Sequence, residues 1–114
     1  MKRIEALIKP HQLADVKAAL YGKGLLPGLT ATELRGYVEG VFERSIYRGV
    51  EQKLDLFPRI KIEVIAHDDL VERLVAVIAR VARTGRGDDG EILVSDVVAA
   101  VRIRTGEIDE AAIS

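Results

Sequence analysis

Apolar and polar residues alternate in two stretches of the chain, at the period of a half-buried β-strand. In residues 2–9 and again in residues 60–66, isoleucine, valine and alanine alternate with charged residues. Each stretch is followed by a change to helical spacing, with an apolar stripe that begins at Leu13 after the first and at Leu70 after the second. The pattern therefore predicts two strand–helix units in succession.

Weaker extended stretches complete each unit. Residues 29–36 follow the first helical stripe and contain threonines that favour strands, and residues 92–94 follow the second stripe after a glycine-rich link. A last extended piece is expected at residues 101–104 and a tail at residues 106–114. Two βαβ units predict one α+β domain over residues 1–114 with a ferredoxin-like fold, in which both helices cover one face of a four-stranded antiparallel sheet.

The predicted sheet has an apolar second face. Leu7, Ile65 and Leu93 fall on the side of their strands that points away from the helices. An exposed apolar surface on a small domain marks a contact with another chain. We therefore expect this face to be buried against other subunits.

The longest link between predicted strands is Tyr37–Phe57, which is too long for a structureless loop in a small domain. It holds four of the five aromatic residues of the chain, interleaved with charged residues. One interpretation is an extended β-hairpin with Gly40 or Gly49 at its turn. The other is a mobile arm that presents tyrosine and arginine to a partner and folds on contact. The two interpretations are compatible with each other.

Composition and charge exclude several classes of protein. Lys and Arg total 17 against 18 Asp and Glu, so no overall field attracts nucleic acid or an anionic membrane. The absence of cysteine excludes disulfides, thiolate zinc sites and a cysteine nucleophile. The longest apolar run, residues 74–79, is far shorter than a membrane span, and the N-terminus lacks the apolar core of a signal peptide. We expect a cytoplasmic protein without membrane insertion.

The sequence offers no catalytic or metal constellation. Ser45 and Ser95 stand in no recognisable catalytic context. His11 and His67 stand at the expected helix entrances, where a surface residue is more typical than a ligand. We therefore expect a protein that is not an enzyme and holds no metal.

A series of short motifs, in a fixed order, gives the chain a family likeness. These motifs are Ile4-Glu5-Ala6, Ile8-Lys9-Pro10, Thr32-Glu33-Leu34-Arg35-Gly36, Tyr47-Arg48-Gly49, Lys61-Ile62-Glu63, Asp68-Asp69-Leu70-Val71-Glu72, Ala82-Arg83-Thr84-Gly85, Val94-Ser95-Asp96 and Ile103-Arg104-Thr105-Gly106-Glu107. Over nearly its whole length the chain resembles the PII signal-transduction proteins. The resemblance implies a homotrimer with adenine nucleotides in the clefts between subunits. It also implies that Tyr37–Phe57 is the T-loop, which contacts target transporters or enzymes.

The resemblance further implies that residues 84–91 form the B-loop, which contacts phosphate. Glycines there let backbone amides approach phosphate oxygens, although such a link by itself is typical of a helix C-cap and turn. Arg102 and Arg104 lie two positions apart on the expected last strand, and the resemblance implies that they reach a nucleotide held by the neighbouring subunit. Without the resemblance, two such arginines are more typical of the solvent-exposed edge of a sheet. The implied nucleotide contacts are Leu7, Thr30, Gly36, Tyr37, Val38, Glu63, Ile65, Arg86, Gly87, Asp88, Asp89, Gly90, Arg102 and Arg104.

At the base of the T-loop the resemblance is incomplete. Nitrogen-sensing members carry a glutamine and a lysine for 2-oxoglutarate where this chain has Gly40 and Val41, and Arg59 matches a lysine that pairs with the effector carboxylate. The tyrosine that some members use for uridylylation corresponds to Gln52. These departures argue against 2-oxoglutarate sensing and against that modification. The implied partner contacts on the T-loop are Phe42, Arg44, Tyr47, Arg48, Glu51 and Gln52.

Two acidic replacements in the B-loop bear on the choice of nucleotide. Asp88 stands where the family has a glycine, and Glu91 stands where it has a phosphate-binding lysine. Reversing a charge about 4 Å from a phosphate changes the interaction by roughly 2 to 8 kcal/mol, unless the side chain turns away or a cation binds. We expect AMP or ADP to be favoured over ATP. A metal held by Asp88 and Asp89 is a weaker alternative.

The leading functional hypothesis is a divergent PII-like regulator that is not an enzyme. It senses adenine nucleotides and controls a transporter or enzyme through its T-loop, in bicarbonate and carbon metabolism, with bicarbonate as a candidate second ligand. The alternative is a nitrogen-regulatory PII protein that senses ATP with 2-oxoglutarate. A small ferredoxin-like phosphatase, for which the sequence supplies no nucleophile, and an ion-binding oligomer without a nucleotide are further alternatives.

Overall fold

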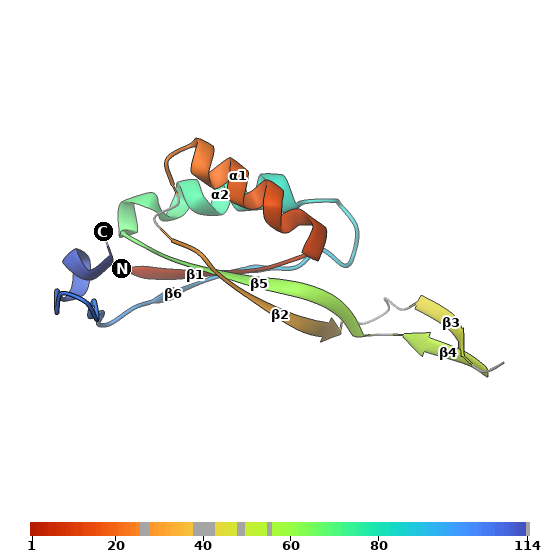
Figure 1. Ribbon diagram of the computed structural model, residues 1–114. Coiled ribbons are helices and arrows are strands. Elements are labelled where there is room, and N and C mark those ends of the chain that lie inside the picture. The colour runs from red at the N-terminus through yellow and green to blue at the C-terminus, as the bar shows by residue number, and fades with distance from the viewer. Residues whose placement is uncertain (26–27, 38–42, 48–49, 55, 114) are drawn as a thin grey trace.

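The computed structural model of this chain describes residues 1–25, 28–37, 43–47, 50–54 and 56–113, with the backbone alone described in 43–47 and 50–54. Two helices cover one face of a sheet, and a separate hairpin extends from the end of that sheet (Figure 1). The elements in chain order are β1 (Lys2–Ile8), η1 (Pro10–Gln12), α1 (Leu13–Gly22), β2 (Thr30–Tyr37), β3 (Glu43–Tyr47), β4 (Val50–Leu54), β5 (Leu56–Ala66), η2 (Asp68–Leu70), α2 (Val71–Ala82), β6 (Ile92–Asp96) and η3 (Asp109–Ile113), where η marks a 3-10 helix.

The main sheet has four strands in the order β2–β5–β1–β6, and each neighbouring pair is antiparallel. β1 and β5 form the central pair, with Ile4 opposite Val64 and Leu7 opposite Lys61. Each strand–helix unit contributes one central strand and one edge strand. The α+β, ferredoxin-like fold with a four-stranded antiparallel sheet is therefore confirmed.

The core lies between the sheet and the helices and is aliphatic. The residues that alternate along β1 and β5 meet the apolar stripes of α1 and α2, where Leu20, Leu74 and Ile78 are fully buried. The buried apolar residues of the described part of the chain are Ile4, Ala6, Ile8, Val16, Leu20, Leu25, Ile60, Ile62, Val64, Ala66, Leu74, Val77, Ile78 and Ala112. No aromatic ring contributes to this set, so the aromatic residues of the T-loop are not needed to build the core.

Residues 37–57, the predicted T-loop, contain β3 and β4, which pair antiparallel with Tyr47 opposite Val50. The described backbone thus forms the hairpin that one of the two interpretations predicts, and it projects beyond the ends of β2 and β5 (Figure 1). Four of the predicted contacts lie on its strands: Arg44, Tyr47, Glu51 and Gln52. The predicted contacts that lie outside the described residues are Val38, Gly40, Val41, Phe42 and Arg48.

The extended piece predicted at residues 101–104 is not a strand. Val101 and Ile108 instead form a single antiparallel bridge around a turn, which a backbone hydrogen bond of 2.8 Å from the Arg102 amide closes. Gly106 has a φ of +75° in this turn, a left-handed conformation that glycine adopts at little cost. The prediction of an extended piece was wrong, because an apolar–polar alternation over only four residues is weak evidence for a strand and the nearby glycine favours a turn.

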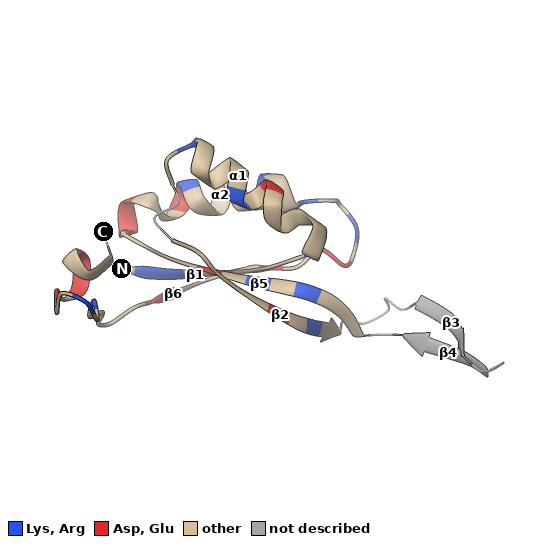
Figure 2. Cartoon of the chain, in the orientation of Figure 1, with Lys and Arg blue, Asp and Glu red and all other residues tan. Residues whose placement is uncertain are grey.

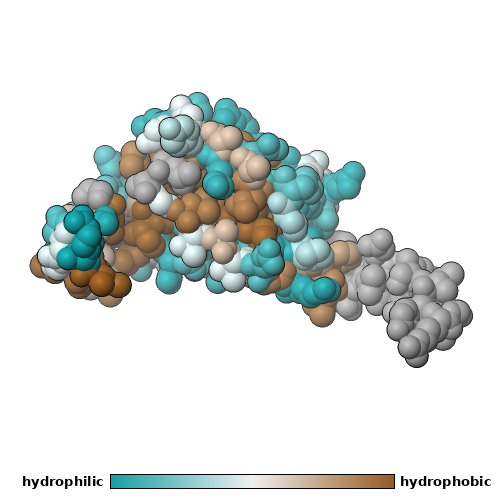
Figure 3. Space-filling model, viewed as in Figure 1, coloured by the Kyte–Doolittle hydropathy of each residue, from teal (hydrophilic) through white to brown (hydrophobic). Residues whose placement is uncertain are grey.

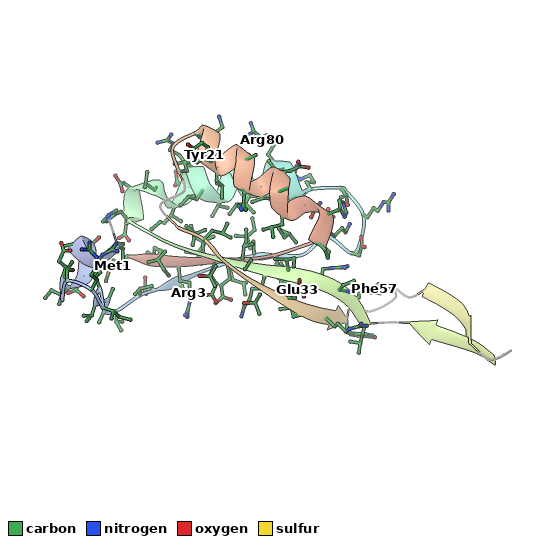
Figure 4. All side chains as sticks on the ribbon, in the orientation of Figure 1. Met1, Arg3, Tyr21, Glu33, Phe57 and Arg80 are labelled. Atoms are coloured by element: carbon green, nitrogen blue, oxygen red, sulfur yellow. The ribbon has the colours of Figure 1, made fainter. Side chains whose placement is uncertain are left out.

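The tail predicted at residues 106–114 is packed against the body of the protein as far as residue 113. It contains η3, in which Ala112 is only 9% exposed. Glu110 binds His67, whose Nδ1 lies 2.7 Å from its carboxylate, and the amino group of Met1 (labelled in Figure 4) lies 3.6 Å from the same carboxylate. These contacts fix the C-terminal segment beside the N-terminal end of β1.

The second face of the sheet and the C-terminal turn expose apolar side chains. Leu7 and Ile65 are half-buried, Leu93 is 55% exposed, and Val98 and Ile103 are 94% and 100% exposed. Figure 3 shows apolar residues (brown) gathered at the end of the molecule that carries the C-terminal turn. Within the ranges that the structure describes, no helix has the length and hydropathy needed to cross a membrane.

Candidate functional site

The link between α2 and β6, residues 83–91, folds around the carboxylate of Asp89. The Thr84 and Gly85 amides both donate to Asp89 Oδ2 at 2.9 Å, and the Thr84 hydroxyl donates to Asp89 Oδ1. Gly85 has a φ of +82°, which helps successive amides to point at one acceptor. Local hydrogen bonds therefore shape this loop, and those to Asp89 occupy two of its amides.

The same hydrogen bonds make the ionisation of Asp89 a probe of the loop. The hydroxyl and amide of Thr84, with the Gly85 amide and nearby Lys9, hold the pKa of the Asp89 carboxyl well below its ordinary value of 3.8. Because the folded pKa is lowered, the contribution of the carboxylate to stability is present above the ordinary pKa and is lost as pH falls through the lowered one. We therefore expect the NMR signal of the Gly85 amide to stay constant down to about pH 4 and to move only below it.

An Asp89→Asn variant is the control for this titration, because its side chain carries no ionisable group. Its Gly85 signal should not move over the same pH range. A transition in the wild-type protein centred at or above 3.8 would contradict the assigned hydrogen bonds.

Among the amides at the predicted phosphate contacts of the loop, three have no acceptor among the described residues. They belong to Gly87, Asp88 and Gly90, whereas the Asp89 amide donates to the Arg86 carbonyl at 3.1 Å. The space around the Cβ position of Gly87 is open. Backbone amides without an internal acceptor in a glycine-rich turn can donate to an anion such as phosphate. The structure thus leaves donors at three of the predicted B-loop contacts.

Gly90 is held against the backbone of β1. A Cβ at this position would lie 2.1 Å from the Leu7 carbonyl oxygen and 2.9 Å from the Leu7 Cβ. The Leu7 amide donates to the Glu91 carbonyl at 3.1 Å, which keeps the two segments together. Only glycine fits at position 90 without a shift of the loop or of β1.

We expect Gly90→Ala to lower the free energy of unfolding by about 1–3 kcal/mol, the usual cost of forcing an extra methyl into a packed site. Gly87→Ala is the matched control, because its Cβ would meet nothing within 4 Å and its φ is not positive. Urea unfolding compares the two variants with the wild-type protein. Equal stability of the two variants would show that the loop does not approach β1 this closely.

Lys9 and Arg59 converge on the loop from the end of β1 and from β5. Lys9 Nζ lies 3.1 Å from Asp88 Oδ1 and 3.5 Å from Asp89 Oδ1, and Arg59 Nη2 lies 3.5 Å from Asp88 Oδ2. The Lys9 and Arg59 side chains are only 13% and 11% exposed. Asp88 is therefore turned toward the body of the protein. Among the described side chains, no group of three or more His, Cys, Asp or Glu residues is arranged to hold a metal ion.

Two residues of this arrangement, Lys9 and Gln12, are absent from the sequence-based prediction of the site. Gln12 is 7% exposed; its Oε1 accepts the Lys9 amide at 2.9 Å and its Nε2 donates to the Ala82 carbonyl at 2.8 Å. It thereby joins the end of β1 to the end of α2, where the loop begins. Lys9 could have been recognised as a candidate site residue, because it belongs to the family motif Ile8-Lys9-Pro10. Nothing in the sequence marked Gln12, which is a single glutamine near a helix entrance.

Two cavities place the predicted nucleotide contacts in separate groups. One cavity of about 300 Å³ adjoins the loop and is lined in part by Leu7, Asp89 and Gly90. The other, of about 360 Å³, lies beside the C-terminal segment, at the opposite end of the sheet from the loop (Figure 1). Its lining residues are Gly28, Leu29, Thr30, Glu63, Ile65, Arg102, Ala112 and Ile113.

The remaining predicted contacts are distributed between these ends. Gly36 belongs with the loop group, because its Cβ position lies 3.7 Å from Arg59 Cγ and it pairs with Phe57 at the start of β5 (Figure 4). Tyr37 ends β2 next to it and is 60% exposed. Arg86 is exposed in the loop and Arg104 in the C-terminal turn. A single chain therefore brings together two partial sets of these residues, not one complete set.

Known proteins match the chain over almost its whole length. The sequence profile of the family described as nitrogen regulatory protein P-II matches residues 1–107. The chain is 50% identical over 107 residues to the nitrogen regulatory protein P-II of Bradyrhizobium diazoefficiens, covering 94% of this chain and 95% of that protein. It is 46% identical over 113 residues to the nitrogen regulatory protein P-II 1 of Escherichia coli, covering 99% of this chain and all of that protein.

Proposed function

This chain belongs to the nitrogen regulatory protein P-II family, and from that premise we propose that it is a signal-transduction regulator of nitrogen metabolism that responds to adenine nucleotides. The observation that carries the proposal is identity of 46–50% over almost the full length to proteins named as nitrogen regulators. Family members are regulators and not enzymes. The proposal places this protein in the cytoplasm.

The comparisons favour nitrogen regulation over the bicarbonate and carbon role that was the leading expectation from the sequence. Both of these relatives carry nitrogen regulation in their names, and neither name refers to bicarbonate. Gly40 and Val41 still replace the residues that the resemblance assigns to 2-oxoglutarate. We therefore expect nucleotide binding to be retained and its enhancement by 2-oxoglutarate to be weak.

We infer a homotrimer in which each nucleotide site is completed by two subunits. The second face of the sheet carries Leu7, Ile65 and Leu93 among charged residues, and together with the exposed Ile103 these side chains supply apolar surface that a partner subunit would cover. The predicted contacts at the B-loop and those around Arg102 lie at opposite ends of one chain. A neighbouring chain is therefore needed to bring an Arg102 next to a B-loop. The hairpin of β3 and β4 extends away from these surfaces and is the proposed contact for a target transporter or enzyme.

Isothermal titration with AMP, ADP and ATP tests the nucleotide part of this function. We expect AMP or ADP to bind more tightly than ATP, because Glu91 is exposed at the end of the loop and repels the most highly charged phosphate chain. Adding 2-oxoglutarate should change the affinity for ATP little. Absence of binding by all three nucleotides would overturn nucleotide sensing, and strong enhancement by 2-oxoglutarate would contradict the weak response inferred from Gly40 and Val41.

A further inference from the structure

The Asp88 carboxylate is shared by two cations that have little access to water. Lys9 Nζ lies 3.1 Å from one of its oxygens and Arg59 Nη2 lies 3.5 Å from the other. The Asp88 side chain is 24% exposed, and Arg59 Nη2 also lies 3.5 Å from the Asp88 backbone oxygen. Charges shielded from solvent interact more strongly than a pair at the open surface. These contacts therefore hold this part of the loop against the sheet.

The three residues come from separate parts of the chain. Lys9 follows β1, Arg59 lies within β5, and Asp88 belongs to the acidic end of the loop that leads into β6 (red in Figure 2). Lys9 Nζ also lies 3.4 Å from the Thr84 hydroxyl and 3.5 Å from Asp89. One ammonium group thus joins the beginning of the loop to its end, and Asp88 extends the connection to β5.

We propose that Asp88 is an internal anion that holds the B-loop closed, and that the phosphates of a nucleotide engage the loop and its two cations only after displacing the Asp88 carboxylate. This inference rests on the proposed function, which brings a phosphate to this loop. Closure by Asp88 lowers the affinity for every anion that needs the open loop by the same factor, whereas simple repulsion by Asp88 grows with the charge of the ligand.

Amide hydrogen exchange without ligand tests the closure directly. In Asp88→Asn, which keeps the shape of the side chain and removes its charge, the Gly85 and Asp89 amides should exchange about tenfold faster than in the wild-type protein. Asp69→Asn is the matched control, because it removes the same charge from an exposed position on η2. Exchange in Asp88→Asn that equals the wild-type rate would overturn the proposal.

A second variant separates closure from charge repulsion. Arg59→Met also breaks a contact of Asp88, so loop exchange should again rise, but it removes a cation that the incoming anion needs. Titration with inorganic pyrophosphate should show about tenfold tighter binding by Asp88→Asn and no gain by Arg59→Met. Tighter binding by Asp88→Asn without faster exchange would assign the effect to repulsion alone and overturn closure.

The inference and the proposed function fail in different ways. If the wild-type protein binds no adenine nucleotide, the proposed function fails, and loop exchange in Asp88→Asn still decides whether the loop is closed by this contact. If ADP binds and the exchange rates do not change, closure fails and the proposed function stands.

Discussion

Leu93→Glu is expected to convert the proposed trimer into single chains. Leu93 lies on β6 opposite Glu5, is 55% exposed in one chain and belongs to the second face of the sheet, which faces away from the helices. Burying a leucine at an interface contributes up to about 3 kcal/mol, and an unpaired carboxylate buried there costs several kcal/mol. Both effects are repeated in every subunit of a symmetric assembly. Sedimentation equilibrium should therefore give the mass of one 12.5 kDa chain for the variant and of three chains for the wild-type protein.

Tyr21→Glu is the matched control for this experiment. Tyr21 lies on α1, on the helical side of the molecule, and is 79% exposed (Figure 4). The same charge placed there should leave the trimer intact. A trimeric Leu93→Glu variant would show that the second face of the sheet is not the subunit interface.

Arg102→Ala is expected to weaken ADP binding by about tenfold to a hundredfold. Arg102 lines the cavity beside the C-terminal segment together with Thr30, Glu63 and Ile65, all predicted nucleotide contacts. A hydrogen bond from a charged donor to phosphate contributes about 1.5–3 kcal/mol, and each 1.4 kcal/mol is a factor of ten in affinity. Isothermal titration with ADP measures the loss.

Arg80→Ala provides the comparison, because Arg80 is an exposed arginine in the last turn of α2, away from this cavity (Figure 4). It removes the same charge and should leave ADP affinity within about twofold of the wild-type value. Sedimentation equilibrium on Arg102→Ala checks that the trimer is retained. Unchanged ADP affinity in a trimeric Arg102→Ala variant would exclude this residue from the site.

The fold could be predicted from the sequence because its core residues follow the strand and helix periods closely. Ile4, Ala6 and Ile8 are buried on β1 as their alternation requires, and Leu74 and Ile78 are buried on α2 as their spacing requires. Residues 101–104 had too short a pattern for this argument, and a turn replaced the expected strand.

The site was harder to predict because its contacts join distant residues. The sequence showed that Asp88 is acidic beside an expected phosphate, and it suggested repulsion as the consequence. It did not show that Lys9, 79 positions away, and Arg59, 29 positions away, both reach its carboxylate. Periodicity assigns a residue to a face of the sheet, but the partner of a loop carboxylate depends on how the loop folds back.

A mixing experiment with two variants tests the shared site most directly. Gly87→Asp places a carboxylate in the open space of the B-loop, and Arg102→Ala removes the arginine at the opposite end of the chain. Neither variant alone should bind ADP well. After the two are unfolded and refolded together, about one third of the clefts in each mixed trimer combine an intact loop with an intact Arg102. If the site is shared between subunits, ADP binding reappears with wild-type affinity in the mixture. A mixture that binds ADP no better than either variant alone would contradict a shared site.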